Sequence, residues 1–435
     1  MKKTAITLML AAALTAGAQT RQWTLEECID YAVAHNISVR QRNIQVSSAQ
    51  LDITEAKDAF LPTLNAGASQ SFNFGRGLTA ENTYADRNTS QFGWSVKLSL
   101  PLFQGLQAKR RLDYARANLS ASEAQTAAAK DEITLQVMAQ YLQVLYTSEM
   151  ADLAAEQMRM SQIELERRRT LLEGGKIPEL DLRQAESQLA QDSLSAVSAQ
   201  ADRTLALFDL SRLMQLPSTE DFDIAPLSQN NPLPLIPNAA TVADNAIDFN
   251  NAMRAARLEI EAADRQISLA RSGYMPRLSF NAGLGSSYYN VSGLDNAPFH
   301  RQMRDNFNKS LGFTLSIPIF DAFGTRNSER KARLQKQNAM LTYEDSEYKL
   351  RTAIGQAWHQ ADAARRKYDA AVAACDAARI AFEAMQEKYN FGRANSTEYE
   401  QAKSTYYNAQ VKALQANYET QLRVRVLDFY NTPHM

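Results

Sequence analysis

The sequence has little cysteine, little histidine and no excess of either charge, and each shortage excludes a class of protein. Two cysteines, Cys28 and Cys375, are too few for a disulfide framework, and we expect both to be small buried residues on helices. The four histidines are not spaced as metal ligands, and no nucleophile lies beside a base, so we expect no metal, no cofactor and no catalytic residues. The 47 basic and 48 acidic residues nearly cancel, which gives no indication of a nucleic-acid partner.

Long apolar runs are missing beyond the first segment, so the sequence predicts no transmembrane helix. Residues 1–18 combine Lys2 and Lys3 with a short apolar stretch that ends in Ala16 and Ala18. This pattern is typical of a secretory signal peptide cleaved after Ala18. We therefore expect an exported protein.

Four stretches of the chain alternate apolar residues with small polar ones, which is the pattern of β-strands. Each is close to the ~9–11 residues that a tilted strand needs to cross a bilayer. A half-buried soluble sheet alternates in the same way. Here, however, the polar positions are almost uncharged and aromatic residues gather at the strand ends, as in membrane barrels. We interpret the stretches as transmembrane strands with these residues facing lipid: Phe72, Trp94, Leu98, Phe280, Leu284, Phe313 and Leu315.

The chain consists of two similar halves, because short segments of the first recur 217 residues later, as with Gly175 and Gly392 (392 − 175). The first repeat, 19–216, is expected to contain a helix from about Thr24 to Phe60, a hairpin at 62–101, a long helix at 107–172 and a return helix at 178–216. The second repeat, 238–435, is expected to contain a helix at 238–272, a hairpin at 276–319, a long helix at 324–389 and a return helix at 396–431. A proline-rich linker, 217–237, joins the repeats.

Four strands cannot close a barrel, and an open sheet edge is not tolerated in lipid, because its backbone groups would lack hydrogen-bond partners. The chain must therefore share strands with copies of itself. Two copies would give eight strands and an interior filled by side chains, whereas three would give twelve strands and room for a lumen. In that arrangement the Ser, Asn and Gly faces line a wet interior.

The sequence resembles the TolC-like outer membrane efflux proteins (outer membrane factors). The resemblance rests on the opening segment Trp23–Glu27, the duplicated hairpins and two turns of the form G-x5-[DE]. It implies a mixed α and β membrane fold: a homotrimer with one shared twelve-stranded β-barrel in the outer membrane, continued by an α-helical coiled-coil tube in the periplasm. It also implies a passive exit duct for efflux or type I secretion, with outer membrane lipid, a periplasmic adaptor (membrane fusion) protein and an inner-membrane pump as partners.

In that family the two turns between long and return helices form the periplasmic tip. The resemblance places the adaptor-contacting tip at Gly174, Gly175, Lys176, Ile177 and Pro178, and at Phe391, Gly392, Arg393, Ala394 and Asn395. It places the pore constriction at Asp181, Glu398 and Gln401. A helix-capping role is open for both acids, because Asn395 and Glu398 form a capping-box pattern and Asp181 lies near a helix start. Gln401 replaces a second acid, so a double acidic gate is not expected.

An exported trimeric coiled-coil protein with a structural or adhesive role, and without channel activity, is the alternative. Such a protein needs sustained heptads and has no use for two matched amphipathic hairpins. The alternation in the hairpins therefore favours the channel.

Overall fold

The computed structural model describes residues 22–78, 82–218, 222–227 and 236–432, in which helices and strands form two compact units. The helical unit comprises the chain up to Ile44, Ala124–Ala255 and the chain from Glu344, and the sheet unit comprises Gln45–Glu123 and Ala256–Tyr343. The expected signal peptide and part of the expected linker lie outside the described residues. Within those residues, no helix is both long enough and apolar enough to cross a membrane.

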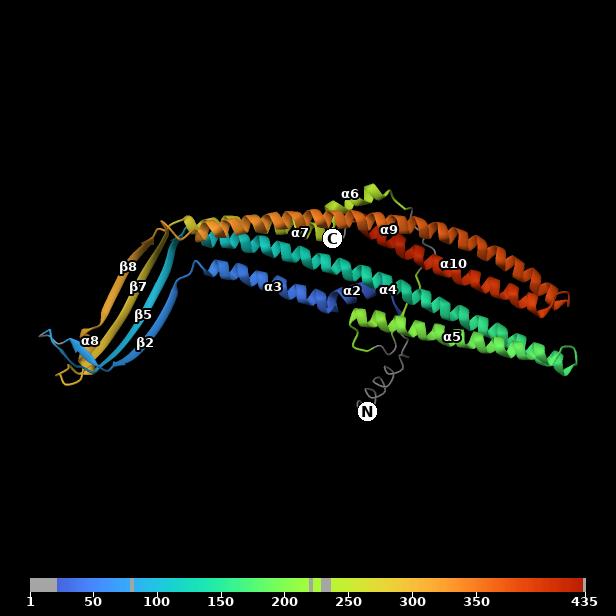
Figure 1. Ribbon diagram of the computed structural model, residues 1–435, viewed down its shortest axis with the longest axis horizontal. Coiled ribbons are helices and arrows are strands. Elements are labelled where there is room, and N and C mark those ends of the chain that lie inside the picture. Colours follow the sequence, from blue (N-terminus) through green and yellow to red (C-terminus); the bar gives the residue numbers. More distant parts are fainter. Residues whose placement is uncertain (1–21, 79–81, 219–221, 228–235, 433–435) are drawn as a thin grey trace, which may run out of the picture. The chain divides into compact units, whose positions relative to one another are not determined.

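The sheet unit contains one four-stranded antiparallel sheet (Figure 1). Its strands are β2 (Thr63–Asn73), β5 (Thr89–Gln104), β7 (Arg277–Val291) and β8 (Asn308–Ser316), in the order β2-β5-β7-β8. The pairing of β5 with β7 joins the hairpin of the first half to that of the second. A register shift between Pro101 and Phe103 carries β5 past its expected end, because proline is tolerated in a strand at a bulge.

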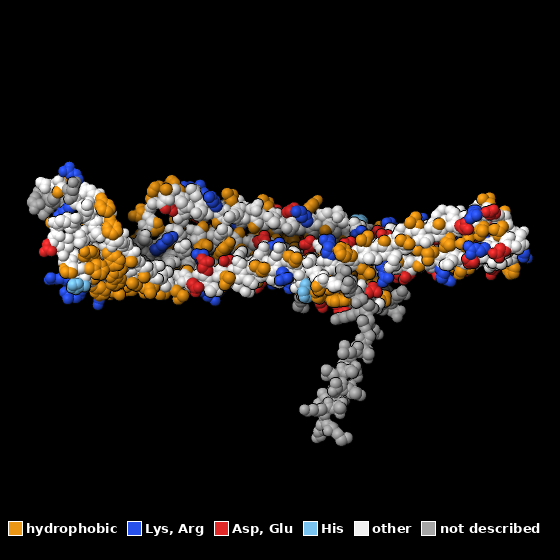
Figure 2. All heavy atoms as spheres, turned by 90° about the horizontal axis from the view of Figure 1, so that it is seen from below, with side chains coloured by type: hydrophobic (Ala, Val, Ile, Leu, Met, Phe, Trp, Pro, Cys, Tyr) orange, Lys and Arg blue, Asp and Glu red, His pale blue; other side chains and the backbone are white. Residues whose placement is uncertain are grey.

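Strand register gives the sheet one apolar and one polar face. Val96 pairs with Ala66 on one side and Leu284 on the other, so residues of the same parity share a face across the strands. All seven residues that the sequence assigned to lipid lie on this apolar face. The rings of Phe280 and Phe313 lie 5.3 Å apart on it. Figure 2 shows hydrophobic side chains gathered over the sheet.

Three elements beyond the ends of the sheet strands were not predicted from the sequence. They are the ribbon of β3 (Arg76–Leu78) and β4 (Tyr84–Asp86) and the short helix α8 (Phe299–Asp305). Elements of three to seven residues are too short for hydrophobic periodicity to reveal them. All three lie at the loop end of the sheet, which is the end remote from the helices (Figure 1).

The helical hairpins repeat with equal lengths in the two halves. Helices α4 (Gln107–Glu173) and α9 (Gly324–Asn390) have 67 residues each, and the return helices α5 (Glu179–Met214) and α10 (Ser396–Asn431) have 36 each. In the helical unit, α5 runs back along α4 and α10 runs back along α9 (Figure 1). The main core of this unit includes Val137 and Val144 of α4 with Leu210 and Met214 of α5, at the spacing of one apolar helix face.

The start of the described chain is fixed to the middle of α4. Strand β1 (Gln22–Trp23) pairs in parallel with β6 (Asp223–Ile224). The hydroxyl oxygen of Tyr141 lies 2.5 Å from the carbonyl oxygen of Ala225 and 3.1 Å from that of Trp23. Thr24 then caps the first helix. Its hydroxyl accepts a hydrogen bond from the backbone N–H of Glu27, and the carboxylate of Glu27 accepts one from the backbone N–H of Thr24. Thr24 and Glu27 therefore form a capping box.

The expected continuous helices at 24–60 and 238–272 are wrong, because each is interrupted at an asparagine. The first divides into α2 (Leu25–His35) and α3 (Ile37–Asp58), and the second into α6 (Ala239–Phe249) and α7 (Asn251–Arg271). The side-chain oxygen of Asn36 accepts the N–H of Ser38 at 2.9 Å, and that of Asn250 accepts the N–H of Ala252 at 3.0 Å. These local bonds replace helical ones and restart the helix in a new direction.

Cys28 is fully buried and Cys375 is half-buried, and both are free thiols. The expectation of two buried cysteines therefore holds only for Cys28. Burial raises the pKa of the Cys28 thiol to about 12, so this thiol stays protonated and unreactive at neutral pH.

Candidate functional site

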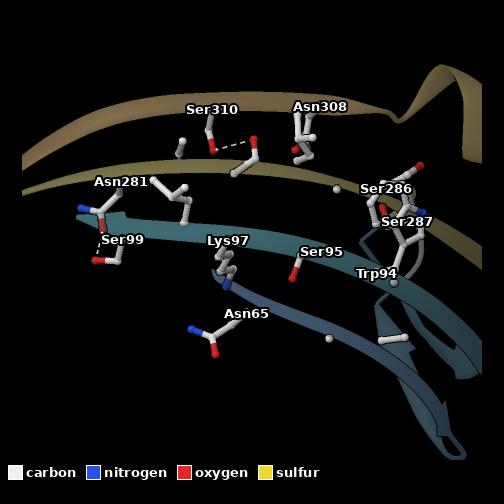
Figure 3. Close-up of a pocket in the computed structure, with 18 of the residues that line it drawn as sticks. Asn65, Trp94, Ser95, Lys97, Ser99, Asn281, Ser286, Ser287, Asn308 and Ser310 are labelled. Carbon is white, nitrogen blue, oxygen red and sulfur yellow. Dashed lines mark hydrogen bonds between the residues drawn. The ribbon is translucent and has the colours of Figure 1, made fainter. Parts of the chain in front are cut away.

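The polar face of the sheet lines a hollow of about 1000 Å³. Figure 3 shows Asn65, Ser95, Lys97, Ser99 and Ser310 directed into it from three different strands. Register explains the arrangement, since one rung across the sheet reads Asn65, Lys97, Gly283, Ser310. The glycine leaves the centre of the rung open. Small side chains of this kind make a wide, hydrophilic surface that is not shaped to one particular ligand.

Few hydrogen bonds tie the polar face together. The Ser99 hydroxyl donates to the side-chain oxygen of Asn281 at 3.0 Å, and the Asn281 amide donates to the hydroxyl of Thr314 at 3.1 Å. Lys97 is the charged residue in the middle of the face, and its side chain makes no ion pair with any residue in the described ranges. The face thus presents mostly neutral hydrogen-bonding groups, with Lys97 in its middle and Arg277 at one end.

The two turns that the sequence assigned to the tip have the same backbone conformation. Gly175 and Gly392 adopt φ of +67° and +71°, a left-handed conformation that favours glycine. The N–H of Lys176 donates to the carbonyl of Leu171, and that of Arg393 donates to the carbonyl of Lys388, which closes both helices in the same way. The tip segments belong to the helical unit and are mostly exposed; Phe391 is the most exposed large apolar side chain among them, at 77%.

The three constriction candidates are not joined to one another in the described chain by any hydrogen bond or ion pair. The carboxylate of Glu398 accepts the backbone N–H of Asn395 at 3.0 Å, so its predicted capping box is confirmed. Asp181 is the third residue of α5, half-buried and without a capping bond from its side chain. Gln401 is exposed, one turn beyond Glu398. These residues therefore lie close to the helix starts, on two different hairpins.

A buried ionic network near the tip joins the two hairpins. Arg168 of α4, only 3% exposed, donates to Glu164 at 2.9 Å, to the backbone oxygen of Asp181 at 3.2 Å and to Glu400 of α10 at 3.3 Å. The hydroxyl of Tyr389, on α9, donates to Glu164 at 2.6 Å. One guanidinium thus holds α4, the first turn of α5 and α10 together.

A second buried chain of polar groups lies beside the first. The ammonium of Lys403 donates to the Ser161 hydroxyl at 2.6 Å, and that hydroxyl donates to the carboxylate of Asp192 at 2.5 Å. All three residues are less than a tenth exposed. Together with the Arg168 group, they connect α4, α5, α9 and α10 by charged hydrogen bonds, which are stronger than neutral ones.

Burial shifts the pKa of several groups in this network. Burial raises the pKa of Glu400, and the nearby charges of Lys403 and Arg168 offset this only in part. Burial alone would lower the pKa of Arg168, but its hydrogen bond to Glu164 and the surrounding negative charges outweigh it and raise the pKa. Burial and the bond to Glu164 also raise the pKa of Tyr389. At neutral pH the arginine stays charged and the tyrosine stays protonated.

This network was not predicted from the sequence, although the helical pattern contains a signal for it. On α4 the buried positions Ala154, Ser161, Leu165 and Arg168 follow one another at seam spacing, so a serine and an arginine occupy places where an apolar residue is expected. Charged residues on an apolar seam are rare unless they are paired. Within the described residues, no group of three or more His, Cys, Asp or Glu is arranged to hold a metal ion.

Comparison with known proteins agrees with this architecture. The sequence is 22% identical to outer membrane efflux protein BepC of Brucella suis, over 95% of this chain and 86% of that protein. It is 24% identical to alkaline protease secretion protein AprF of Pseudomonas aeruginosa, over 79% of this chain and 70% of that one. The crystal structure of the Campylobacter jejuni CmeC outer membrane channel has the same fold, with a TM-score of 0.75, 18% identity and coverage of 94% and 85% of the two chains.

The match to a protein family extends over most of the chain. Residues 28–214 and 242–430 each match the family described as outer membrane efflux protein, so both repeats carry its signature. BepC is named as an outer membrane efflux protein, and CmeC is described as an outer membrane channel. The chain therefore belongs to the outer membrane efflux protein family and is located in the outer membrane.

Proposed function

We propose that this protein is the exit duct of a tripartite efflux or type I secretion machine and conducts substrates passively to the exterior. The observation that carries the proposal is the sheet itself. It has an apolar face, a polar face and two edge strands, β2 and β8, each of which pairs on one side only within the described chain. In lipid such edges must be paired, which requires further copies of the chain.

The order of the strands allows the sheet to continue from one copy to the next. Neighbouring strands are antiparallel throughout, so β2 and β8 run in opposite directions. The β8 of one copy can therefore pair with the β2 of the next in the same antiparallel manner. Three copies give a closed barrel of twelve strands whose interior is lined by the polar face, including Lys97. An even number of strands per chain is what makes this closure possible.

Exposed apolar side chains on the helices also support self-association. Ile37, Ile44 and Leu51 on α3 are exposed and spaced by seven residues, as are Leu334, Leu341 and Tyr348 on α9. Seven-residue spacing is that of helices packed as coiled coils. These stripes have the chemistry of contacts between copies, which would extend the barrel into a helical tube.

We further propose that the two glycine turns contact a periplasmic adaptor and that Asp181, Glu398 and Gln401 line the pore constriction. The turns support this because they are exposed, share one conformation and carry Lys176 and Arg393 at equivalent positions. A ring of carboxylates from three copies would concentrate negative potential at the tube entrance.

The duct proposal is tested by the mass and conductance of the detergent-extracted protein. A trimer that conducts ions in a planar bilayer is the expected result. A monomer would refute the shared barrel, and a trimer without conductance would favour the structural or adhesive alternative. Adaptor contact is tested by placing a photo-crosslinking residue at Lys176 or Arg393, with exposed Lys130 in the helical unit as control. Crosslinking to a co-expressed adaptor that is equal at all three positions would refute the assigned contact.

A further inference from the structure

Helix α8 is packed onto the apolar face of the sheet at its loop end. The Phe299 ring lies 5.2 Å from that of Tyr288 and 5.8 Å from that of Phe92, and the Phe307 ring lies 6.2 Å from that of Trp94. Register assigns Phe92, Trp94 and Tyr288 to the apolar face. Helix α8 and the residues directly after it therefore add aromatic side chains to the face that the proposed function turns toward lipid.

Hydrogen bonds fix the position of this helix. The Gln302 side chain accepts the N–H of Tyr289 and donates to its carbonyl, both at 3.0 Å, and thus pairs with β7 as another strand would. The Ser286 hydroxyl donates to the backbone oxygen of Met303 at 2.7 Å, and the Asn306 amide donates to the backbone oxygen of Ser287 at 2.6 Å. These hydrogen bonds thus hold the segment in a defined position on the surface of the sheet.

Three exposed cations accompany these aromatic residues. The side chains of Arg301 and Arg304 are 65% and 76% exposed, and both approach Asp305, at 3.7 Å and 2.9 Å. The Lys309 ammonium lies 5.6 Å from the centre of the Phe307 ring. Lys309 pairs with Leu284, so it stands on the apolar face, in the same row as the apolar residues of β8. Figure 2 shows Lys and Arg side chains beside the hydrophobic patch of the sheet.

We propose that this α8 patch, made of Arg301, Arg304 and Lys309 with the rings of Phe299 and Phe307, binds the phosphate groups of lipid A in the outer leaflet. The proposal rests on the proposed membrane orientation, in which the loop end of the sheet meets the outer surface. Aromatic side chains favour the headgroup level, and a cation on a lipid-facing strand costs little only at that depth. Lys309 occupies such a terminal position on β8.

The mixture of charge and exposed apolar area distinguishes a lipid from free phosphate. Phe299 and Phe307 remain 51% and 43% exposed between the cations. Arg and Lys side chains pair with phosphate oxygens by charged hydrogen bonds, while the rings contact the first methylene groups of the acyl chains. Inorganic phosphate would gain only the first of these contacts. A ligand with both a phosphate and acyl chains fits the whole patch.

The test is a titration of the full-length protein, in detergent, with fluorescent diphosphoryl lipid A. Each cation near an anionic lipid surface contributes about fivefold in affinity. We expect the triple variant R301Q/R304Q/K309Q to bind at least tenfold more weakly, and D305N, which removes the one carboxylate between the arginines, to bind a few-fold more tightly. The variant R301K/R304K, which keeps both charges, should retain most of the affinity.

Matched controls separate this proposal from the proposed function. The variant R365Q/R366Q/R379Q removes three cations of α9 that are paired with acids, as Arg301 and Arg304 are, and it should bind as wild type does. Dephosphorylated lipid A should bind weakly, and millimolar inorganic phosphate should not compete. Equal affinity of wild type and the R301Q/R304Q/K309Q variant, both still trimeric, would overturn the lipid site while leaving the duct intact. Loss of the trimer in wild type would instead overturn the duct.

Discussion

Replacing Arg168 by glutamine tests whether the buried network holds the two helical hairpins together. Arg168 is 3% exposed and donates to Glu164, Asp181 and Glu400. Removing one member of a buried ion pair leaves charges unpaired and costs about 3–5 kcal/mol. At the lower value, local opening of the hairpin ends becomes more frequent by roughly 100-fold, since 1.4 kcal/mol is about tenfold. Native-state hydrogen exchange of amides in 179–190 and 396–405 measures this opening directly.

The neighbouring Arg169 supplies the matched control. Its side chain is 50% exposed and pairs at 3.0 Å with Glu166, which is 61% exposed. An exposed pair of this kind contributes about 0.2–1 kcal/mol, so R169Q should accelerate exchange by no more than about fivefold. R168K, which keeps the charge but cannot reach all three acceptors, should lie between the two. Equal acceleration in R168Q and R169Q would refute the holding role of the network.

Three further predictions follow from other parts of the structure. Tyr141→Phe removes the hydroxyl shared by two backbone carbonyls and should lower the free energy of unfolding by about 1–2 kcal/mol, measured by chemical denaturation; an unchanged value would contradict the contact. Burial raises the pKa of Glu400 above 4.5, so its stabilising contribution is full below pH 4.5 and is lost as pH rises through the folded-state pKa. The melting temperature of wild type minus that of E400Q should therefore increase as pH falls from 7 to 4.5. A temperature difference that does not change with pH would contradict a raised pKa of Glu400. Phe280→Lys on the apolar face should reduce the yield of protein in the outer membrane, at a cost of about 2–4 kcal/mol near the bilayer centre, whereas Ser279→Lys on the polar face should not; similar yields would show that the faces are misassigned.

Much of the fold could be predicted from the sequence because its signals are local and repeated. Strand alternation is strict, so the side of the sheet on which Leu98 or Phe313 lies follows from parity alone. The helix starts at Thr24 and Asn395 carry capping boxes that the sequence displays directly. Glycine at both tip turns likewise indicates a residue with a left-handed backbone conformation. Each of these features depends on residues close together in the chain.

Several of the features that were missed depend on partners outside their own element. The break at Asn36 uses its own side-chain oxygen, but its amide also donates to the backbone oxygen of Leu213. Arg168 and Glu400 are separated by 232 residues, and nothing local shows that they meet. Helix α8 is fixed by Gln302 reaching back to Tyr289 across a turn. Periodicity reports which face of an element is apolar, and it does not report which faces come together.

The two halves have helices of equal length, but different residues occupy the matching positions. At the offset of 217 residues, Arg168 corresponds to Met385 and Tyr389 corresponds to Leu172. The first hairpin contributes Glu164 and Arg168 to the network, and the second contributes Tyr389 and Glu400. In a ring of identical half-length chains, every junction between neighbouring hairpins would be the same. Fusion of two halves creates two kinds of junction, so substitutions can adjust the one inside a chain without altering the one between chains.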